Sequence, residues 1–270
     1  MDWNTYHTED ITERYVYRYL SFEKLEHFLI TGSLYLARLD RFEDNLEGIT
    51  PYDIIELMAR LKTKEKPKNP NSKIPDDIQN NLINYSRKTL AEIQKKLSEI
   101  QKKRFICCWF LGDVESMGMW DLYAPSGFAI RFERKYFQTI IKRGVQIPEN
   151  IKTGLDLIVA GKVVYQNFDE MIKNEKQSLL KYSVFRKHRA FKHEEEYRLV
   201  GFHSSLIDKS GFEYKLGTIQ DLEFDLYANP RMNTLSFTTY SEIIKHYSEK
   251  HKLLESKLKT LLELRDLKFN

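Results

Sequence analysis

Residues 15–37 read YVYRYLSFEKLEHFLITGSLYLA, and this stretch decides how the fold begins. Residues 15–20 are rich in aromatic and β-branched side chains in alternation, which predicts a strand. Ser21 is suited to cap a following helix with one apolar face, and Gly32 is a typical helix stop. Residues 33–37 then predict a second strand. The chain therefore opens with a strand–helix–strand unit.

Further strand signals follow this unit, and helical patterns lie between and after them. The expected strands are 104–110, 127–132, 162–166 and 197–202. We expect a helix from Asp169 to Lys187 and a closing amphipathic helix within residues 240–270, from Ser241 to about Leu264. We expect an α+β fold class. We expect residues 1–270 to form a single domain.

The composition excludes several classes of protein. Hydrophobic residues make up 41% of the 270 residues, which is enough for a core and argues against global disorder. No apolar run reaches the roughly 18 residues of a membrane helix, and the N-terminus has no signal-peptide pattern. Cys107 and Cys108 are adjacent, so they cannot form a disulfide framework. We expect a cytoplasmic protein with no membrane partner.

The net charge of +4 is unevenly distributed along the chain. From Lys62 to Arg104 there are 12 basic and 5 acidic residues, a local balance of 12 − 5 = +7. Residues 52–103 combine a lysine- and proline-rich loop with a long helical pattern, which predicts a basic helical insertion. One functional hypothesis is therefore a non-catalytic module that senses a nucleic acid or ligand, in which the 62–104 segment binds an acidic partner.

A strong local motif is HEEEYRLV, residues 193–200. On a strand, alternation would place Glu194, Glu196 and Arg198 on one side and Tyr197 on the other. Two carboxylates so close repel each other unless a cation lies beside them, and Arg198 is a candidate for that cation. Two interpretations remain open: an ion-pair ladder on a solvated sheet face, or a glutamate at a sheet edge that binds a hydroxyl or activates a nucleophile.

The second motif is SMGMWDLYAP, residues 116–125. Met119, Trp120 and Tyr123 have helical spacing just before a proline. Such a cluster belongs either to the core or to a wall that stacks a heteroaromatic ring, because Trp120 and Tyr123 both carry a polar group as well as a flat ring.

Metal-binding signals are weak. In the polar stretch 39–48, Asp44 and Glu47 form either a turn or part of a metal site, but the EF-hand spacing is absent. The histidines lack zinc spacing, so no metal is predicted. A third functional hypothesis is nevertheless a metal-dependent nuclease that uses Asp44, Glu47, Glu194 and Glu196. No dinucleotide, P-loop or hydrolase fingerprint is present.

Taken together, three blocks of sequence resemble a known family. They are YVYRYLSFEKLEHFLITGSLYLARLDRFEDNLEG (residues 15–48), CCWFLGDVESMGMWDLYAPSGFAIRFE (residues 107–133) and KHRAFKHEEEYRLV (residues 187–200). These blocks are similar to the bacterial family known as domain of unknown function 2971. The segment 52–103 does not match it.

The opening block is also, more distantly, similar to ADP-ribosyltransferase folds. In those proteins the first strand carries an Arg or His, the place of Arg18 here, and a later strand carries Glu-x-Glu, the place of Glu194 and Glu196. The middle Ser-x-Ser or Ser-x-Thr motif of the arginine class is replaced by Ser116-Met117-Gly118. This resemblance implies a split, mostly antiparallel β-sheet with flanking helices.

The same resemblance implies an activity on NAD. Cleavage of the nicotinamide–ribose bond passes through an oxocarbenium-like state, as glycoside cleavage does. The resemblance implies Glu196 as the catalytic carboxylate, Glu194 as the group that orients or deprotonates the acceptor, and Arg18 as the anchor of NAD. Other residues expected at the NAD site are Tyr19, Trp120, Tyr123 and Arg198.

The leading hypothesis is accordingly an ADP-ribosyltransferase-like or NAD-cleaving bacterial protein, such as a toxin or an anti-phage defence effector. It would transfer ADP-ribose to a macromolecular acceptor, a protein or a nucleic acid, or to water. The closing helix of residues 240–270 is a possible surface for forming a homo-oligomer.

Overall fold

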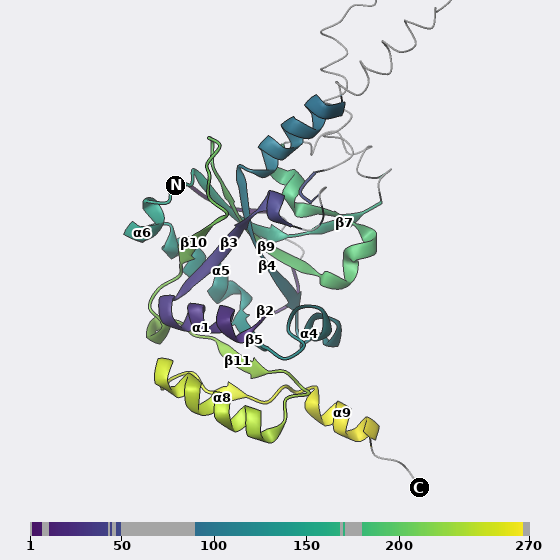
Figure 1. Ribbon diagram of the computed structural model, residues 1–270, viewed down its shortest axis with the longest axis vertical. Coiled ribbons are helices and arrows are strands. Elements are labelled where there is room, and N and C mark those ends of the chain that lie inside the picture. The colour runs from purple at the N-terminus through teal and green to yellow at the C-terminus, as the bar shows by residue number, and fades with distance from the viewer. Residues whose placement is uncertain are drawn as a thin grey trace, which may run out of the picture.

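The computed structural model describes residues 2–6, 11–42, 44, 47–49, 90–167, 170 and 180–266. Over this part the fold is mixed α/β, with a large, mostly antiparallel open sheet (Figure 1). The strands of the large sheet are β1 (Asp2–Tyr6), β2 (Tyr15–Leu20), β3 (Ser33–Arg38), β4 (Arg104–Gly112), β5 (Phe128–Glu133), β6 (Leu157–Lys162), β9 (Glu196–Phe202), β10 (Gly211–Lys215), β11 (Asp225–Ala228) and β12 (Leu253–Leu254). A second, two-stranded sheet contains β7 (Val164–Gln166) and β8 (Arg186–His188).

Helices connect and cover these strands. The α-helices are α1 (Phe22–Thr31), α4 (Met117–Tyr123), α5 (Arg134–Gly144), α6 (Pro148–Ile151), α8 (Thr234–Tyr247) and α9 (Lys259–Asp266), and the 3-10 helices are η1 (Leu39–Arg41), η3 (Leu180–Phe185), η4 (Arg189–Glu194) and η5 (Ile219–Asp221). Residues 90–101 are also helical. None of the helices in the described ranges is long and apolar enough to cross a membrane.

The expected strand–helix–strand unit is confirmed as β2–α1–β3. The apolar face of α1, formed by Leu25, Phe28 and Leu29, is buried against the sheet. The helix ends at Gly32, which has the left-handed φ of 62° and donates its N–H to the Phe28 carbonyl oxygen at 2.8 Å. The turn needs glycine because a left-handed residue with a side chain is strained.

The sheet divides where β2 and β3 meet β4. One edge of β4 pairs with β9 from Arg104 to Phe110. On the opposite edge, β3 pairs at Phe105 and Ile106, whereas β2 pairs only from Phe110 to Gly112. Residues 107–109 therefore have no strand partner on that edge among the described residues. The two strands diverge there into separate branches, β3–β10 and β2–β5–β11–β12.

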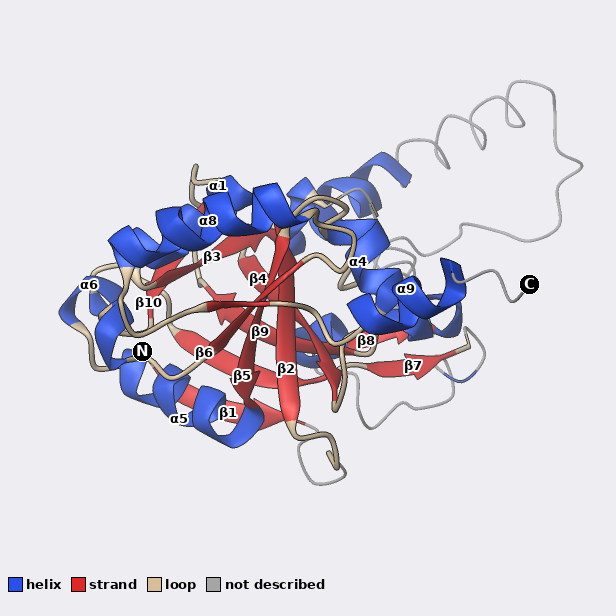
Figure 2. Ribbon diagram, turned by 90° about the horizontal axis from the view of Figure 1, so that it is seen from below, coloured by secondary structure: helices blue, strands red, loops and turns tan. Residues whose placement is uncertain are grey.

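Three buried clusters lie on the two faces of this sheet. The largest cluster packs α1, α5 and α8 onto one face of the sheet. On the other face, one cluster joins α4 to β2 through Trp120 and Tyr19, and another gathers around Val184 and Val200. Figures 1 and 2 both show α5 and α6 on one side of the molecule, and α4, α9 and β7 on the other.

The expectation of one closing helix in residues 240–270 is wrong, because α8 ends at Tyr247, α9 begins only at Lys259, and β12 lies between them. Tertiary contacts outweigh helical propensity at the break. The Ser248 hydroxyl lies 2.8 Å from Nδ1 of His251, and Nε2 of His251 lies 2.9 Å from the Leu222 carbonyl oxygen. Leu253 and Leu254 then extend the sheet beside β11.

Two other helical expectations are tested only in part. In the segment expected to be one helix from Asp169 to Lys187, residues 169 and 171–179 lie outside the described residues, and the end is instead η3 followed by β8. In the expected insertion 52–103, residues 90–101 form a helix between η1 and β4, as expected. Residues 52–89, and with them most of the basic 62–104 segment, lie outside the described residues, so the sensing hypothesis stays a prediction.

We predict that Gly32→Ala destabilises the fold by about 1–3 kcal/mol, the usual cost of a non-glycine residue in this backbone region. An added Cβ would also lie 2.0 Å from the Gly217 carbonyl oxygen. The matched control is Gly118→Ala at an exposed position of α4, where the nearest atom would be 3.8 Å away. Urea unfolding should show Gly118→Ala unchanged or more stable, and equal stabilities for the two variants would contradict the account.

Candidate functional site

A cavity of about 910 Å³ lies where the sheet divides. Its lining includes Arg18, Cys107 and Trp109, which belong to the face covered by α1, and Cys108 and Glu196, which belong to the opposite face. Because the two faces of an intact sheet are separated by the backbone, one cavity reaches both only through the gap between β2 and β3. The gap therefore joins two chemically different ends of a single site.

Arg18 marks one end of the cavity. Its Nη1 donates to the Cys107 thiol, and its guanidinium carbon lies 5.8 Å from the centre of the Trp109 ring. Among the described residues, Arg18 forms no ion pair with a carboxylate. Burial raises the pKa of the Cys107 thiol despite the nearby Arg18 charge, so the thiol is neutral at physiological pH. The guanidinium is thus a cation available to an anionic ligand.

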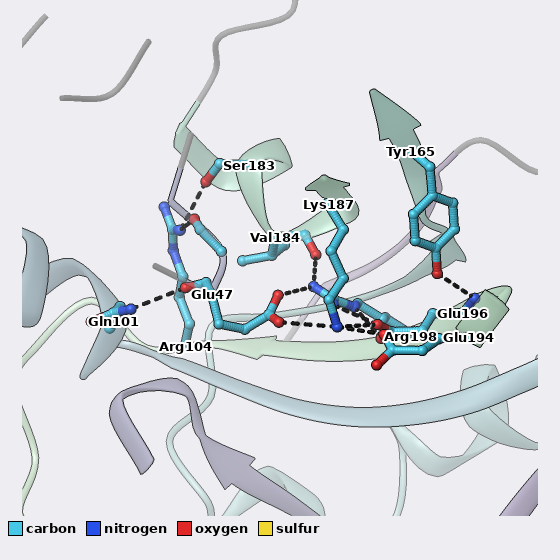
Figure 3. A network of polar contacts seen from close by, with 11 residues as sticks. Glu47, Gln101, Arg104, Tyr165, Ser183, Val184, Lys187, Glu194, Glu196 and Arg198 are labelled. Carbon is cyan, nitrogen blue, oxygen red and sulfur yellow. Dashed lines mark hydrogen bonds and ion pairs between the residues drawn. The ribbon is translucent and has the colours of Figure 1, made fainter. Parts of the chain in front are cut away.

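The other end of the cavity contains a cluster of five charged side chains, Glu47, Lys187, Glu194, Glu196 and Arg198 (Figure 3). We call this set the ion-pair cluster. Arg198 is 1% exposed, and its Nε lies 2.7 Å from Oε2 of Glu196. Its Nη1 lies 2.8 Å from Oε1 of Glu47 and donates to the Val184 carbonyl oxygen at 2.5 Å. The guanidinium charge is therefore matched within the protein.

Lys187 joins the carboxylates of the ion-pair cluster (Figure 3). Its Nζ lies 2.5 Å from Oε2 of Glu194, 2.9 Å from Oε1 of Glu196 and 3.4 Å from Oε2 of Glu47. The ammonium offsets part of the repulsion that the three carboxylates exert on one another. Lys187 was not found by sequence reasoning, because it was placed on the polar face of an expected helix rather than on β8.

A turn in the backbone brings Glu194 beside Glu196. Glu194 is the last residue of η4 and does not lie on β9. The expectation that Glu194, Glu196 and Arg198 all lie along one strand is therefore wrong for Glu194. Glu195 adopts a left-handed φ of 35° between them. Such a conformation is costly for a residue with a side chain. Here it is supported by hydrogen bonds from the Glu195 N–H to Lys192 and from the Leu111 N–H to Glu195.

Glu196 and Arg198 do share one face of β9, and Tyr197 lies on the other, as expected. Arg198 is indeed the cation beside Glu196. The interpretation as a ladder on a solvated sheet face is wrong, because Glu196 and Arg198 are both buried. The cluster is instead an internal charged network that opens into the cavity.

The environment of the cluster shifts the pKa values of its two neighbouring glutamates, Glu194 and Glu196, in opposite directions. Burial alone would raise the pKa of Glu196, but the charges of Arg198 and Lys187 outweigh it and hold this pKa well below its ordinary range. Burial, and then the neighbouring Glu196 carboxylate, raise the pKa of Glu194 above its ordinary value. Burial disfavours the charged form of Lys187, but Glu196 and Glu47 raise its pKa overall, so Lys187 stays protonated.

Of the residues expected at the NAD site, the cavity is lined by Arg18, Tyr19, Tyr123, Glu194, Glu196 and Arg198. Tyr123 is half-exposed and donates its hydroxyl to Oε1 of Glu194 at 3.1 Å. Tyr19 accepts a hydrogen bond from the Ser116 N–H at 2.8 Å, which holds the start of α4. The fold therefore brings these residues, which are far apart in the sequence, to the wall of one cavity.

Trp120 does not reach the cavity surface. Its side chain is fully buried, its ring packs edge-to-face on Tyr19 with centres 4.9 Å apart, and its Nε1 donates to Glu115. Of the two interpretations of the SMGMWDLYAP motif, Trp120 follows the core interpretation. The expected stacking of Trp120 on a ligand ring is therefore wrong, because the ring is buried and the indole N–H already donates to Glu115 inside the protein.

The carboxylates of the nuclease hypothesis also meet at the cavity, where Asp44, Glu47, Glu194 and Glu196 are all among its lining residues. Lys187 and Arg198 lie among three of them, in the positions where a cation would be bound. Within the ranges that the structure describes, no group of three or more metal-ligating side chains has a geometry suited to a metal ion. The arrangement therefore favours a charged network built from side chains.

Comparison with families of known proteins gives a match over part of the chain. The model of a family described as protein of unknown function (DUF2971) matches residues 119–199, which confirms the resemblance to that family over this part of the chain. The matched range runs from α4 to β9 and includes Tyr123, Lys187 and Glu194, whereas Arg18 lies outside it. No curated protein and no solved structure matches the chain.

We predict that the contribution of Glu194 to stability falls as pH rises. The folded protein raises the pKa of this carboxyl above 4.5, so it binds more protons than the unfolded chain above that pH. The unfolding free energy of the wild type, relative to that of Glu194→Gln, should therefore decrease as the pH rises above about 4.5, until the carboxyl group is ionised in the folded protein as well.

Urea unfolding across this pH range measures the difference, and Glu249→Gln, an exposed carboxylate outside the cavity, is the matched control. A difference between wild type and Glu194→Gln that stays constant or grows with pH would contradict the raised pKa. Glu196 should behave in the opposite way, because its depressed pKa makes its contribution full above about pH 4.5 and lost at lower pH.

Proposed function

We propose that the cavity binds NAD and cleaves its nicotinamide–ribose bond, with transfer of ADP-ribose to water or to a macromolecular acceptor, as in ADP-ribosyltransferase-like proteins. The observation that carries the proposal is that Arg18 and Glu194 line one cavity through a divided sheet. A volume of about 910 Å³ lies in the usual range of small-molecule sites. The distant sequence resemblance to ADP-ribosyltransferases supports the same conclusion.

The two ends of the cavity suit the two parts of this substrate. The Arg18 guanidinium is suited to bind the pyrophosphate through paired hydrogen bonds. At the other end, the negative charge of the carboxylates stabilises the positive charge that develops on the ribose as the C1′–N bond breaks. The electron pair of that bond goes to the nicotinamide nitrogen, and the nucleophile forms the new bond to C1′.

The structure changes the roles that we propose for the two glutamates. The sequence resemblance implied Glu196 as the catalytic carboxylate, but both of its oxygens face Arg198 or Lys187. Among the described residues, Glu194 pairs with one cation, Lys187, and accepts from the Tyr123 hydroxyl, which leaves further lone pairs for a ligand. We therefore propose Glu194 as the base that takes the proton of the nucleophile, and Glu196 as the positioning residue that holds Lys187 and Arg198 in place.

The raised pKa of Glu194 fits the role of a base, because proton transfer is most efficient when the pKa of the base approaches the working pH. Tyr123 orients this carboxylate by hydrogen bonding to Oε1. Burial and the Glu194 charge raise the pKa of Tyr123, so its hydroxyl remains protonated and acts as a donor.

We predict that the protein releases nicotinamide from NAD and that Glu194→Gln lowers kcat by about 10²–10⁴-fold, the usual contribution of a general base. The amide keeps the shape of the side chain but cannot accept a proton. The measurement is nicotinamide release by chromatography, with Glu249→Gln as the control for removing one carboxylate charge elsewhere.

Wild-type turnover in Glu194→Gln would refute the assignment of Glu194. Absence of nicotinamide release from the wild-type protein, both in water and with protein or nucleic-acid acceptors, would contradict the proposed function. Glu196→Gln tests the positioning role of Glu196. Because it removes a partner of the buried Arg198, it should lower the unfolding free energy as well as the turnover.

A further inference from the structure

The turn that contains Glu47 and Gly48 is held by two residues at the end of the 90–101 helix and the start of β4. Nε2 of Gln101 donates to the Glu47 carbonyl oxygen at 3.0 Å, and Nη1 of Arg104 donates to the Gly48 carbonyl oxygen at 2.8 Å. Both side chains are buried, and neither is among the described residues that line the cavity. Figure 3 shows Glu47 between these two residues and the cations of the cluster. Residues outside the cavity therefore fix the backbone of this turn.

Arg104 also links this turn to a second segment that supplies a partner to Arg198. Its Nη1 donates to the Ser183 hydroxyl at 2.9 Å. The next residue, Val184, accepts a hydrogen bond from Nη1 of Arg198 through its carbonyl oxygen at 2.5 Å. One buried guanidinium outside the cavity thus spaces two of the segments that surround the buried guanidinium at the cavity wall.

The position of the Glu47 carboxylate depends on this backbone support. Its Oε1 lies 2.8 Å from Nη1 of Arg198 but accepts no hydrogen bond of good geometry in the described part of the chain. Its Oε2 lies 3.4 Å from Nζ of Lys187, which is longer than a usual charge-assisted hydrogen bond. Because charge attraction without directed hydrogen bonds acts over a range of positions, the turn determines where the carboxylate lies.

The position of Glu47 in turn sets the charge of the ion-pair cluster. Glu47, Glu194 and Glu196 contribute three carboxylates, whereas Lys187 and Arg198 contribute two cations, so the balance of these five ionised side chains is 2 − 3 = −1. If Glu47 moved out of contact, the remaining balance would be 2 − 2 = 0. That change would favour the ionised form of Glu194, because one nearby negative charge is lost.

Three further titratable groups act on these carboxylates from β4, α4 and β7, namely Cys108, Tyr123 and Tyr165. Burial raises the pKa of each of them, so all three are uncharged at neutral pH. The charge of the cluster is therefore set by its own five members.

We infer that Gln101 and Arg104 are positioning residues for the site, because they hold the 47–48 turn so that the Glu47 carboxylate stays beside Arg198 and Lys187. The effect on turnover rests on the proposed function, since it acts through Glu194, the proposed base. The effect on the protonation of Glu194 does not depend on that function. Both positioning residues lie outside residues 119–199, the range that the family model matches.

The test replaces Gln101 by methionine, which has a similar length but no hydrogen-bond donor. Carbon NMR of the full chain with isotope-labelled glutamate carboxyl groups follows the protonation of Glu194, and Glu194→Gln identifies its signal. In Gln101→Met the titration midpoint of Glu194 should move down by about one pH unit, because the turn no longer keeps Glu47 in the cluster.

Gln138→Met is the matched control. On α5, Nε2 of Gln138 donates to the Tyr197 hydroxyl at 2.8 Å, and Gln138 is not among the described residues that line the cavity. The control loses a similar hydrogen bond from a side-chain amide, and it should leave the midpoint of Glu194 unchanged.

A second variant separates positioning from a general loss of structure. Glu47→Gln removes the charge directly and should lower the midpoint by a similar amount. Gln101→Met added to Glu47→Gln should then cause no further shift, because the charge through which Gln101 acts is already gone. Arg104→Lys, which keeps the charge but loses the planar guanidinium, should shift the midpoint in the same direction as Gln101→Met.

An unchanged midpoint in Gln101→Met or in Glu47→Gln, or a further shift in the double variant, would overturn the inference. If the protein releases nicotinamide from NAD, the acidic limb of the pH profile of kcat should move with the NMR midpoint. The expected midpoints without any turnover would leave the positioning inference standing and contradict the proposed function. Turnover with unchanged midpoints would do the reverse.

Discussion

The buried guanidinium of Arg198 is the constraint on which the site depends. A cation that is 1% exposed is stable in a protein only when carboxylates and carbonyl oxygens surround it. These partners come from separate segments, since Glu196 precedes it on β9, Glu47 follows η1, and the Val184 carbonyl oxygen belongs to η3. Satisfying one charge thus draws three segments together, and Lys187 and Glu194 complete the cluster.

The divided sheet gives this cluster access to a ligand. If one strand paired with β4 along its whole length, the backbone of an intact sheet would separate Arg18 on one face from Glu194 on the other. Their divergence at residues 107–109 lets one cavity contact both faces, with an excess of carboxylate at one end. At the other end lies the Arg18 guanidinium, which has no carboxylate partner within the described part of the chain. A long ligand that is anionic in its middle and cationic at one end matches this arrangement.

Local patterns in the sequence predict local structure well. The β2–α1–β3 unit follows from alternation, one apolar helix face and Gly32, and all three are properties of neighbouring residues. The partner of Glu194 was not predictable in this way, because Lys187 reaches it only through the turn at Glu195 and the placement of β8. The break between α8 and α9 has the same origin, since His251 binds Leu222, which is distant in sequence.

The most direct test is a crystal structure of the protein with a non-cleavable analogue of NAD. We predict that the analogue spans the divided sheet, with its phosphates on the Arg18 guanidinium and its nicotinamide ring against Tyr123, within hydrogen-bonding distance of Glu194. A ligand bound on one face only, or one that contacts Arg18 and Glu194 in the reverse orientation, would contradict the account. Such a result would mean that the gap between β2 and β3 does not serve as a single binding site.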